Sequence, residues 1–361
     1  MLTKIKSALK IKIRKKNWFN NQYSHKLQAK AVLKALEAEK GKTNPLYKKL
    51  SEEYAQDVLG WIGFAPWLNT YSAARGEFKE GWIPVNYFEG IVLPKITGLY
   101  NNNMCKAKTL AAKLINSVCF PDVAYYVNGL FFTSAWEVLL PKGAEGYIFS
   151  QTERVVFKLD NSAGGGRGIY ILTRTTFDTE KICKLGNGVF QKYIQQHELF
   201  ERIMPNSVAT LRLTSVIENS GKISCRAAHL KIGRIEDLCV RPSSSIVVML
   251  DLISGELHEK GYFHRDWRSV NQHPDTGEGF LGKVIPKFNE CITSIIEAHS
   301  SIPFYRVIGW DIVVDKNNEI QFMEFEMSTS AIAEAIQGPC FTGMEWEKLK
   351  PICMPNDCLT C

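Results

Sequence analysis

Residues 155–169 read VVFKLDNSAGGGRGI, and this stretch decides how the chain is interpreted. Apolar residues lead into Lys158 and continue again after Gly168, so the pattern predicts two strands of a hairpin around a glycine loop. Clustered glycines let backbone N–H groups approach a polyphosphate, because no Cβ stands in the way. A flexible hairpin tip without a ligand can carry the same glycines, so the loop alone does not decide between the two.

Better-known glycine loops do not fit this order. A Walker loop needs a glycine where Leu36 stands, five residues before the Gly-Lys-Thr of residues 41–43. A dinucleotide fold needs a helix after the glycines, whereas a strand is predicted here. Residues 264–266 (His-Arg-Asp) and Asn271 match a protein-kinase catalytic loop. In kinases, however, the glycine loop precedes the strand lysine, and no Asp-Phe-Gly follows in this chain, so we interpret the match as chance.

A second informative stretch is GWDIVVDKNNEIQFMEFE, residues 309–326, which predicts an antiparallel hairpin. The expected register places Asp311 opposite Phe322, with Phe322, Glu324 and Glu326 on the same face as Asp311. Three carboxylates on one face repel each other unless a cation lies between them. Mg²⁺ combines few carboxylates with substrate phosphates, so the cluster suits two ions, and a solvated acidic hairpin is the alternative.

Two basic residues lie on predicted strands before this hairpin. Alternation over residues 208–217 places Arg212 on one face with Thr210 and Thr214. An arginine beside hydroxyl groups can bind an acyl phosphate or stabilise its developing charge. Lys231 ends the next predicted strand. Either cation could instead be an ordinary surface residue of a strand.

The rest of the chain predicts an α+β fold with mostly antiparallel strands, since no β-α-β rhythm or internal repeat is visible. Residues 60–100 are rich in aromatics, Gly and Pro, and we expect irregular structure there. The other expected elements are helices over 26–59 (broken at 41–45), 104–117 and 286–299, and strands over 223–231, 245–252 and 306–326.

Composition restricts the class of protein. The 361 residues are 45% hydrophobic and 22% charged, which excludes a disordered chain, a coiled coil and a collagen-like fibre. No apolar stretch approaches the roughly 18 residues of a membrane span, and no secretory signal is predicted. The 10 cysteines fit free thiols in a reducing cytoplasm. Cys340, Cys353, Cys358 and Cys361 also have a spacing found in metal sites, but a terminal ligand such as Cys361 makes free thiols the favoured interpretation.

The net charge of +7 is concentrated at the N-terminus. Residues 1–50 contain 14 Lys and Arg but 2 Asp and Glu, leaving 30 basic and 35 acidic residues in the remainder. Within residues 1–16, apolar residues recur at helical spacing among lysines. A helix with such a stripe could bind an anionic membrane surface or nucleic acid. Alternatively, it is a solvated helix whose apolar stripe packs against the rest of the protein. Nothing further in the composition predicts a nucleic-acid partner.

Taken in order, these motifs resemble the ATP-grasp superfamily over residues 101–340, most closely its sugar-transfer-associated type. The family has a lysine on a strand, a glycine hairpin, a linker and late carboxylates on a second hairpin. Cys105-Lys106 resembles the family's Asp-Lys, and QKYIQQHE (residues 191–198) resembles its adenine-binding linker. Residues 273–277 (His-Pro-Asp-Thr-Gly) resemble a subfamily signature.

The resemblance implies an ATP-grasp fold, in which two α+β lobes clasp ATP, and it implies ATP and Mg²⁺ (two ions, with Mn²⁺ as an alternative) as cofactors. It also implies the site residues. Those for ATP are Lys106, Lys158, Gly164, Gly165, Gly166, Gln191, Lys192, Tyr193, Ile194 and Glu198; those for catalysis are Arg212 and Lys231; those for metal are Asp311, Glu324 and Glu326. Arg167, inside the loop, either reaches the transferred phosphate or faces solvent.

Two positions depart from the family. An acid often stands at Gln191, which puts the contact to the adenine amino group in question, and Asn usually stands at Glu326, so this site is more anionic.

The predicted activity is that of a carboxylate–amine ligase. ATP phosphorylates a carboxylate, and an amine attacks the acyl phosphate, with release of ADP and phosphate. A sugar acid or a glycan precursor is the substrate class implied by analogy. A small-molecule kinase on the same fold and a non-catalytic ATP-binding partner protein are the alternatives.

The expected organisation has four segments. Residues 1–100 form a basic arm and a substrate-side domain, and residues 101–190 form the nucleotide-binding lobe with the glycine lid. Residues 191–345 form the lobe with the metal hairpin, and residues 346–361 a cysteine-containing tail. We expect a cytoplasmic protein with small-molecule carboxylate and amine substrates, no nucleic acid, and peripheral contact with the inner face of the membrane through residues 1–16.

Overall fold

The computed structural model describes residues 2–97, 103–115, 119–160 and 168–349. It contains two compact units. Unit 1 comprises residues 1–96, 265–268 and 329–361, and unit 2 comprises residues 97–264 and 269–328. The glycine-loop residues Gly164, Gly165, Gly166 and Arg167, and the cysteines Cys353, Cys358 and Cys361, lie outside the described residues. The four functional segments expected from the sequence stay a prediction, because the two units are defined by compactness and not by function.

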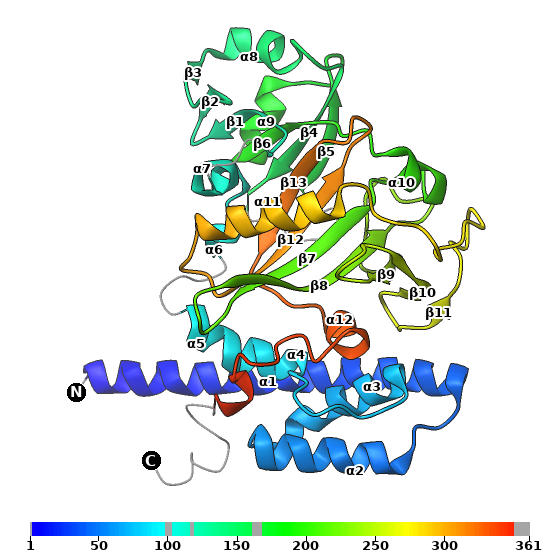
Figure 1. Ribbon diagram of the computed structural model, residues 1–361. Helices are drawn as coiled ribbons and strands as arrows, with labels where there is room; N and C mark the ends of the chain where they lie inside the picture. The colour runs from blue at the N-terminus through cyan, green and yellow to red at the C-terminus, as the bar shows by residue number, and fades with distance from the viewer. Residues whose placement is uncertain (1, 98–102, 116–118, 161–167, 350–361) are drawn as a thin grey trace. The chain divides into compact units, whose positions relative to one another are not determined.

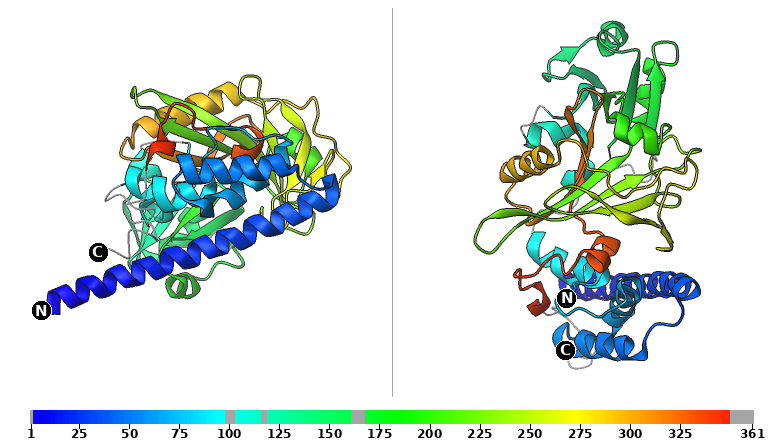
Figure 2. Two further views of the ribbon diagram at one scale, coloured as in Figure 1. Left: turned by 90° about the horizontal axis from the view of Figure 1, so that it is seen from below. Right: turned by 45° about the vertical axis from the view of Figure 1, so that its right-hand side comes forward.

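Unit 1 begins with one long helix, α1 (Leu2–Lys40), which Figure 2 shows as an unbroken rod. The helix ends at Gly41, whose φ of 87° is a left-handed conformation that glycine adopts without strain. Helix α2 (Pro45–Glu53) starts after Asn44, whose side chain accepts the Leu46 N–H at 2.9 Å. The predicted break at 41–45 is therefore confirmed.

Residues 62–75 and 85–97 are helical, so the expectation of irregular structure was wrong there, whereas residues 76–84 are irregular as expected. Helix α3 (Ala65–Arg75) has Pro66 in its first turn and ends at Gly76, with a φ of 86°. Pro and Gly occupy helix ends here, where neither residue disrupts a helix. The remaining helical segments of this unit are η1 (Tyr54–Val58), η2 (Ile62–Phe64), α4 (Val85–Tyr87), η3 (Phe88–Val92), α5 (Leu93–Thr97, ending at the unit boundary), α12 (Ala331–Ile336) and η5 (Trp346–Lys348).

Aromatic rings and one buried carboxylate hold unit 1 together. Trp267, from the inserted residues 265–268, stacks on Tyr71 with ring centroids 6.0 Å apart. The fully buried Glu334 accepts the backbone N–H groups of Ile83 at 2.8 Å and Cys340 at 3.0 Å. The segments of this unit, distant in sequence, are thus joined by both stacking and hydrogen bonds.

Unit 2 contains two antiparallel sheets. The first has six strands in the order β3-β2-β1-β6-β4-β5 (Figure 1). Its hairpin of β4 (Arg154–Leu159) and β5 (Ile169–Thr173) confirms the strands predicted around the glycine loop. The strands that the sequence did not reveal in this sheet are β1 (Asp122–Val127), β2 (Leu130–Thr133), β3 (Val138–Leu139) and β6 (Gly188–Lys192).

A hydrophobic core lies between the first sheet and two helices, α8 (Pro141–Ile148) and α9 (Thr179–Leu185). Phe157 of β4 stacks on Phe190 of β6 with centroids 4.4 Å apart. Gly188 is required beside them, because a Cβ there would lie 2.6 Å from the Lys158 carbonyl oxygen. This close packing fixes β4, and with it Lys158, against the centre of the sheet.

The second sheet has seven strands in the order β11-β10-β9-β8-β7-β12-β13. Its strands are β7 (Thr210–Ile217), β8 (Ile223–Ile232), β9 (Ile246–Leu250), β10 (Leu257–Phe263), β11 (Ser269–Val270), β12 (Val307–Val314) and β13 (Ile320–Glu326). Helix α11 (Phe288–Ser300) packs on one face, against β7, β8 and β12 (Figure 1). The shorter helical segments of the unit are α6 (Asn103–Lys106), η4 (Lys108–Leu110), α7 (Ala111–Ile115) and α10 (Glu198–Ile203). The predicted α+β class with an N-terminal helical region is confirmed.

The α11 face of this sheet contains a chain of buried hydrogen bonds. Trp310 Nε1 donates to Ser215 Oγ at 2.7 Å, and Ser215 Oγ lies 2.7 Å from His299 Nδ1. His299 Nε2 lies 2.7 Å from the Tyr305 carbonyl oxygen, so it donates there and Nδ1 accepts from Ser215. Burial lowers the pKa of His299 to about 4. His299 is therefore a packing residue with both nitrogens satisfied, and the opposite face of the sheet is left for polar chemistry.

Candidate functional site

Asp311 lies at the centre of the face opposite α11. In register it pairs with Arg212 of β7 on one side and with Glu324 of β13 on the other. The predicted pairing of Asp311 with Phe322 was wrong, because a bulge between Asp311 and Ile312 shifts the register. Phe322 instead packs on the Trp310 ring, 5.6 Å away, on the α11 side.

The three carboxylates nevertheless share one face. Glu324 lies opposite Asp311, and Glu326 lies opposite Gly309, two residues earlier on β12. Because side chains two residues apart on a strand point to the same side, Asp311, Glu324 and Glu326 all face away from α11. The bulge changes their spacing and leaves their face as expected.

Two cations surround the buried Asp311 carboxylate. Arg212 Nη1 lies 2.9 Å from Oδ1, and Lys231 Nζ lies 2.8 Å from both Oδ1 and Oδ2. Burial alone would raise the pKa of Asp311, but Arg212 and Lys231 outweigh it and lower the pKa to about 2. Burial lowers the pKa of Lys231, and the Asp311 charge opposes that shift. The three groups act as one buried ionic cluster.

Arg212 also reaches the outer carboxylate. Its Nη2 donates to Glu326 Oε1 and to Ser328 Oγ, the latter at 2.9 Å. The guanidinium passes so close to Gly309 that a Cβ there would lie 2.9 Å from Nε. Glycine at position 309 therefore leaves room for Arg212 to bridge Asp311 and Glu326.

Glu324 is paired with a lysine that the sequence analysis did not select. Lys108 Nζ lies 3.9 Å from Glu324 Oε2, whereas Lys106, the residue implied by the family pattern, is exposed. Asp160, directly after β4, accepts the Thr109 N–H at 3.0 Å and its hydroxyl at 2.8 Å, which fixes the turn that carries Lys108. The Lys-x-Lys spacing of residues 106–108 was the available signal, because either lysine could face the site.

Lys158 is a buried lysine on which the charges of Glu324, Lys108, Asp122 and Asp311 act. The residue is 5% exposed, and none of the described residues forms a hydrogen bond or ion pair with its ammonium group. Burial lowers its pKa, while the nearby Glu324 and Asp122 charges oppose the shift. Buried charges are normally paired, so an ammonium without a partner is a candidate anion ligand.

Of the predicted adenine linker, Gln191 is the residue with the most informative contacts. Its Nε2 donates to Asp122 Oδ1 at 2.8 Å, so its Oε1 is left buried and, among the described residues, without a donor. Burial raises the pKa of Asp122, against the hydrogen bonds from Gln191 and the Tyr125 hydroxyl. Lys192 is exposed, and Tyr193 and Ile194 are half-buried.

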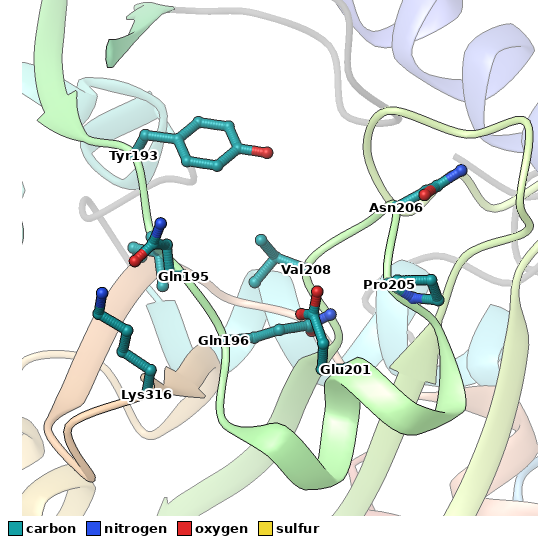
Figure 3. Close-up of a pocket in the computed structure, with 9 residues that line it drawn as sticks. Tyr193, Gln195, Gln196, Glu201, Pro205, Asn206, Val208 and Lys316 are labelled. Carbon is teal, nitrogen blue, oxygen red and sulfur yellow. The ribbon is translucent and has the colours of Figure 1, made fainter. Parts of the chain in front are cut away.

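Tyr193 and Ile194 line a pocket of about 340 Å³. Figure 3 shows Tyr193 and Gln195 of the linker, Glu201 of α10, and Asn206 around one space, with Lys316 at its edge. Glu198, predicted to bind ribose, is exposed at the start of α10 and does not line the pocket. Glu201, one helical turn later, does.

The signature at residues 273–277 fixes the end of β8. His273 Nε2 lies 2.9 Å from the Gly233 carbonyl oxygen, and Asp275 binds the Arg234 guanidinium and accepts the Ile235 N–H at 2.9 Å. The hydrogen bond from Arg234 holds the pKa of Asp275 at about 2. These contacts follow Lys231 by a few residues and so help to position it.

The predicted metal ligands are hard oxygen donors of the type that Mg²⁺ prefers. However, the described residues contain no group of three ligating side chains gathered closely enough to hold an ion by themselves. Asp311 is enclosed by two cations, while Glu324 and Glu326 have side chains 42% and 45% exposed. These carboxylates suit a metal ion that also binds oxygens of a bound substrate. Glu324 and Glu326 are the two carboxylates that such an ion could reach.

Comparison with known proteins places this site in a family. Residues 181–343 match the family model described as sugar-transfer associated ATP-grasp. The match confirms, over these residues, the resemblance to the ATP-grasp superfamily that the motif order predicted. The match includes Arg212, Lys231 and the three carboxylates. None of the curated proteins matches the chain.

Solved structures show distant likenesses. Biotin carboxylase from Campylobacter jejuni is 12% identical, over 71% of this chain and 48% of its own, with a TM-score of 0.42. The D-alanine-D-alanine ligase from Coxiella burnetii is 12% identical, over 68% and 57%, with a TM-score of 0.39. N5-carboxyaminoimidazole synthetase from Staphylococcus aureus, complexed with ADP, is 12% identical, over 62% and 45%, with a TM-score of 0.38. The likeness covers about half the length of each of these chains.

We expect Asp311→Asn to destabilise the protein by about 3 kcal/mol or more, because two buried cations lose their counter-charge. Glu326→Gln is the matched control and should cost at most about 1 kcal/mol, since its side chain is 45% exposed. Urea unfolding of both variants measures the difference. Because the pKa of Asp311 is lowered from 3.8 to about 2, its contribution is present above about pH 4 and is lost as the pH falls towards 2. Equal stabilities of the two variants would contradict the buried cluster.

Proposed function

We propose that the protein is an ATP-dependent ligase that activates a carboxylate as an acyl phosphate and transfers the acyl group to an amine. The observation that carries the proposal is the polar face of the second sheet, with Arg212, Lys231 and three carboxylates. The buried Lys158 ammonium is close enough to feel the charges of Glu324 and Asp311, and it has no hydrogen-bond or ion-pair partner among the described residues. The family match of residues 181–343 supports the use of ATP.

The residues divide the reaction among them. Lys158 and Lys108 bind phosphate oxygens of ATP as point charges on the side of the first sheet. A substrate carboxylate oxygen attacks the γ-phosphorus, and ADP leaves with the electron pair of the broken P–O bond. Arg212 and Lys231 hold the carboxylate and the acyl phosphate formed from it. The amine then forms the C–N bond, phosphate leaves from the acyl carbon, and one proton is released.

Glu324 and Glu326, with Asp311 behind them, would hold Mg²⁺. When bound, the metal neutralises charge on the phosphate oxygens during phosphoryl transfer. Ion pairs with Lys108 and Arg212 balance the two glutamates in the chain itself. Lys106 and Glu198, both exposed, contribute less in this proposal than the predicted pattern implied.

Base recognition is assigned to Gln191. The hydrogen bond from Nε2 to Asp122 orients the side-chain amide, so that its buried Oε1 can accept a hydrogen bond. The adenine amino group is a donor that suits this oxygen. The backbone of Lys192, Tyr193 and Ile194 completes the adenine site, and Glu201, in the pocket of Figure 3, is the better-placed acid for the ribose hydroxyls. The glycines at 164–166 would cover the phosphates.

The substrate class rests on the family description alone: amide formation on a sugar acid, or transfer of an amino acid to a glycan precursor, with small molecules as both substrates. The test measures ADP release against pools of carboxylates and amines, followed by mass spectrometry of the product. A condensed product that requires both partners supports the ligase. A stable phosphorylated product formed without an amine would favour a kinase, and no ligand-dependent ADP release would overturn the proposal.

Lys158→Ala is expected to weaken ATP binding about tenfold or more, because a charge-assisted contact to phosphate is lost. The fold should persist, since the variant removes a buried charge that has no hydrogen-bond or ion-pair partner among the described residues. Lys181→Ala, at an exposed position of α9, is the control and should bind ATP like the parent. Calorimetric titration with the non-hydrolysable analogue AMP-PNP and Mg²⁺ measures the affinities. Parental affinity in a folded Lys158→Ala protein would remove Lys158 from the site.

Glu324→Gln is expected to lower turnover roughly 10²-fold or more, because it removes a full negative charge from a side chain proposed to hold Mg²⁺. Glu326→Asn restores the residue that the family usually has, so activity should persist with a shift to higher Mg²⁺. A Mg²⁺ titration of ADP formation compares the two variants with the parent. A fully active Glu324→Gln protein, or an inactive Glu326→Asn beside an active Glu324→Gln, would show that the ligands are wrongly assigned.

The N-terminal part of α1 is proposed to bring the enzyme to the cytoplasmic face of a membrane. Residues 1–16 contain seven Lys and Arg and no acidic residue, and this segment continues directly into the rest of α1. Lysines beside apolar residues on one helix are attracted to anionic lipid. Among the helices in the described ranges, none combines the length and apolar character that a bilayer crossing requires, so the proposal is for surface attachment.

Deleting residues 1–16 should spare ADP formation in solution while reducing association with vesicles that contain anionic lipid. Cosedimentation with vesicles of phosphatidylcholine and 30% phosphatidylglycerol, at low and high salt, measures this association. Vesicles of phosphatidylcholine alone are the control. Equal binding of the truncated and full chains to anionic vesicles would leave α1 as a solvated helix.

A further inference from the structure

The proposed function does not use the part of the sheet face that lies beyond Arg212 and Lys231. Two histidines lie there. His229 of β8 is opposite Arg212 in register. His264 directly follows β10, and its backbone N–H donates to the Ser245 carbonyl oxygen at 2.9 Å. By strand alternation both point to the same face as Lys231.

Each histidine has an unused nitrogen. His229 is 3% exposed, and the Nδ1 atoms of His229 and His264 are buried with no hydrogen-bond partner in the part of the chain that the structure describes. Buried polar atoms almost always have partners. By contrast, His299, on the opposite face, has both of its nitrogens bonded.

Burial, assisted by the surrounding cations, keeps both imidazoles neutral. The charged or titratable groups that act on His229 are Lys231, Arg212, Asp311 and His264, and those that act on His264 are Lys231 and Arg212. Burial and then these cations lower the pKa of His264 to about 4, and the pKa of His229 is also lowered well below its usual value. Asp311 is already neutralised by Arg212 and Lys231. The region is therefore electropositive, with neutral imidazoles that can accept a hydrogen bond.

We propose that His229 and His264 form the acceptor subsite of the ligase, and that this subsite takes a nucleophile bearing a neutral O–H or N–H, such as a hydroxyl or a weakly basic amino group. The inference rests on the proposed function. An alkylammonium ion is disfavoured, because the charged groups nearest the histidines are Arg212 and Lys231, and Asp311, the one carboxylate that acts on His229, is already paired with both of them.

The order of groups across the sheet supports this assignment. Reading from β13 to β8, the carboxylates come first, then Arg212, then Lys231 with His229. With the phosphate held on the carboxylate side, the acyl group extends past Arg212 and Lys231 towards the histidines, so a nucleophile bound by the histidines can add to the acyl carbon there. In that step the nucleophile's O–C or N–C bond forms, the C–O bond to phosphate breaks, phosphate takes the electron pair, and the nucleophile's proton goes to solvent. The imidazoles bind and position the nucleophile.

Hydroxylamine separates the two half-reactions. It is a small nucleophile that traps an acyl phosphate as a hydroxamate, and at saturating concentration it does not need a dedicated subsite. The carboxylate that supports ADP release in the pool assay is used with Mg-ATP and either hydroxylamine or the acceptor found in the same assay. We expect His229→Leu and His264→Leu to raise the KM for the acceptor roughly tenfold or more, through loss of a hydrogen bond at a buried site, while hydroxamate formation stays near the parental rate.

Two further variants control for structural effects. His229→Asn keeps an amide at the position of Nδ1 and should recover much of the acceptor KM, which a purely structural defect would not allow. His258→Leu, at an exposed position of β10, should behave like the parent. His264 is only half-buried, so its variant gives a second test if His229→Leu does not fold.

The outcomes are distinct. A KM effect confined to the acceptor, rescued by Asn, supports the subsite. An unchanged acceptor KM, an equal loss of hydroxamate, or a strongly basic alkylamine as the best acceptor of the parent would overturn it. Absence of hydroxamate with the parent would instead overturn the ligase proposal, and the subsite with it.

Discussion

The ionic cluster of Asp311 with Arg212 and Lys231 is the constraint on which the rest of the site depends. A carboxylate with 6% exposure is tolerated only because two cations lie within 2.9 Å of it. The three residues lie on β12, β7 and β8, so the cluster also fixes how these strands pair. A slip of one residue would turn the charges towards the apolar face covered by α11, which is prohibitive.

The face of the sheet covered by α11 holds the same strands in place from the other side. Trp310, next to Asp311 on β12, points to α11 and donates to Ser215, which is bonded in turn to His299. Adjacent residues of β12 thus point to opposite faces of the sheet, Trp310 into the packed core and Asp311 into the ionic cluster. Because the packed side has its polar groups satisfied and its rings in contact, the charged side chains project from a rigid platform, which is what positioning of a reactive phosphate requires.

Alternation in the sequence was sufficient to place Arg212, Asp311, Glu324 and Glu326 on one face, since period-two patterns follow from strand geometry alone. The bulge after Asp311 was not predictable, because it depends on how Phe322 packs on Trp310 rather than on a local turn signal. Lys108 and Glu201 were missed for a related reason. Each lies within three residues of the position that the family pattern indicated, and the direction of a side chain on a short helix is set by its tertiary contacts.

Charge balance explains why this chain can hold a glutamate where the family usually has Asn. Arg212 contacts both Asp311 and Glu326, Lys231 contacts Asp311, and Lys108 lies beside Glu324, so three acidic side chains face three basic ones. Glu326 without Arg212 across Gly309 would add repulsion to an acidic cluster. The basic groups in these pairs are those proposed to contact phosphate and acyl oxygens. For the three basic residues of these pairs, ligand binding would then exchange one set of ion-pair partners for another.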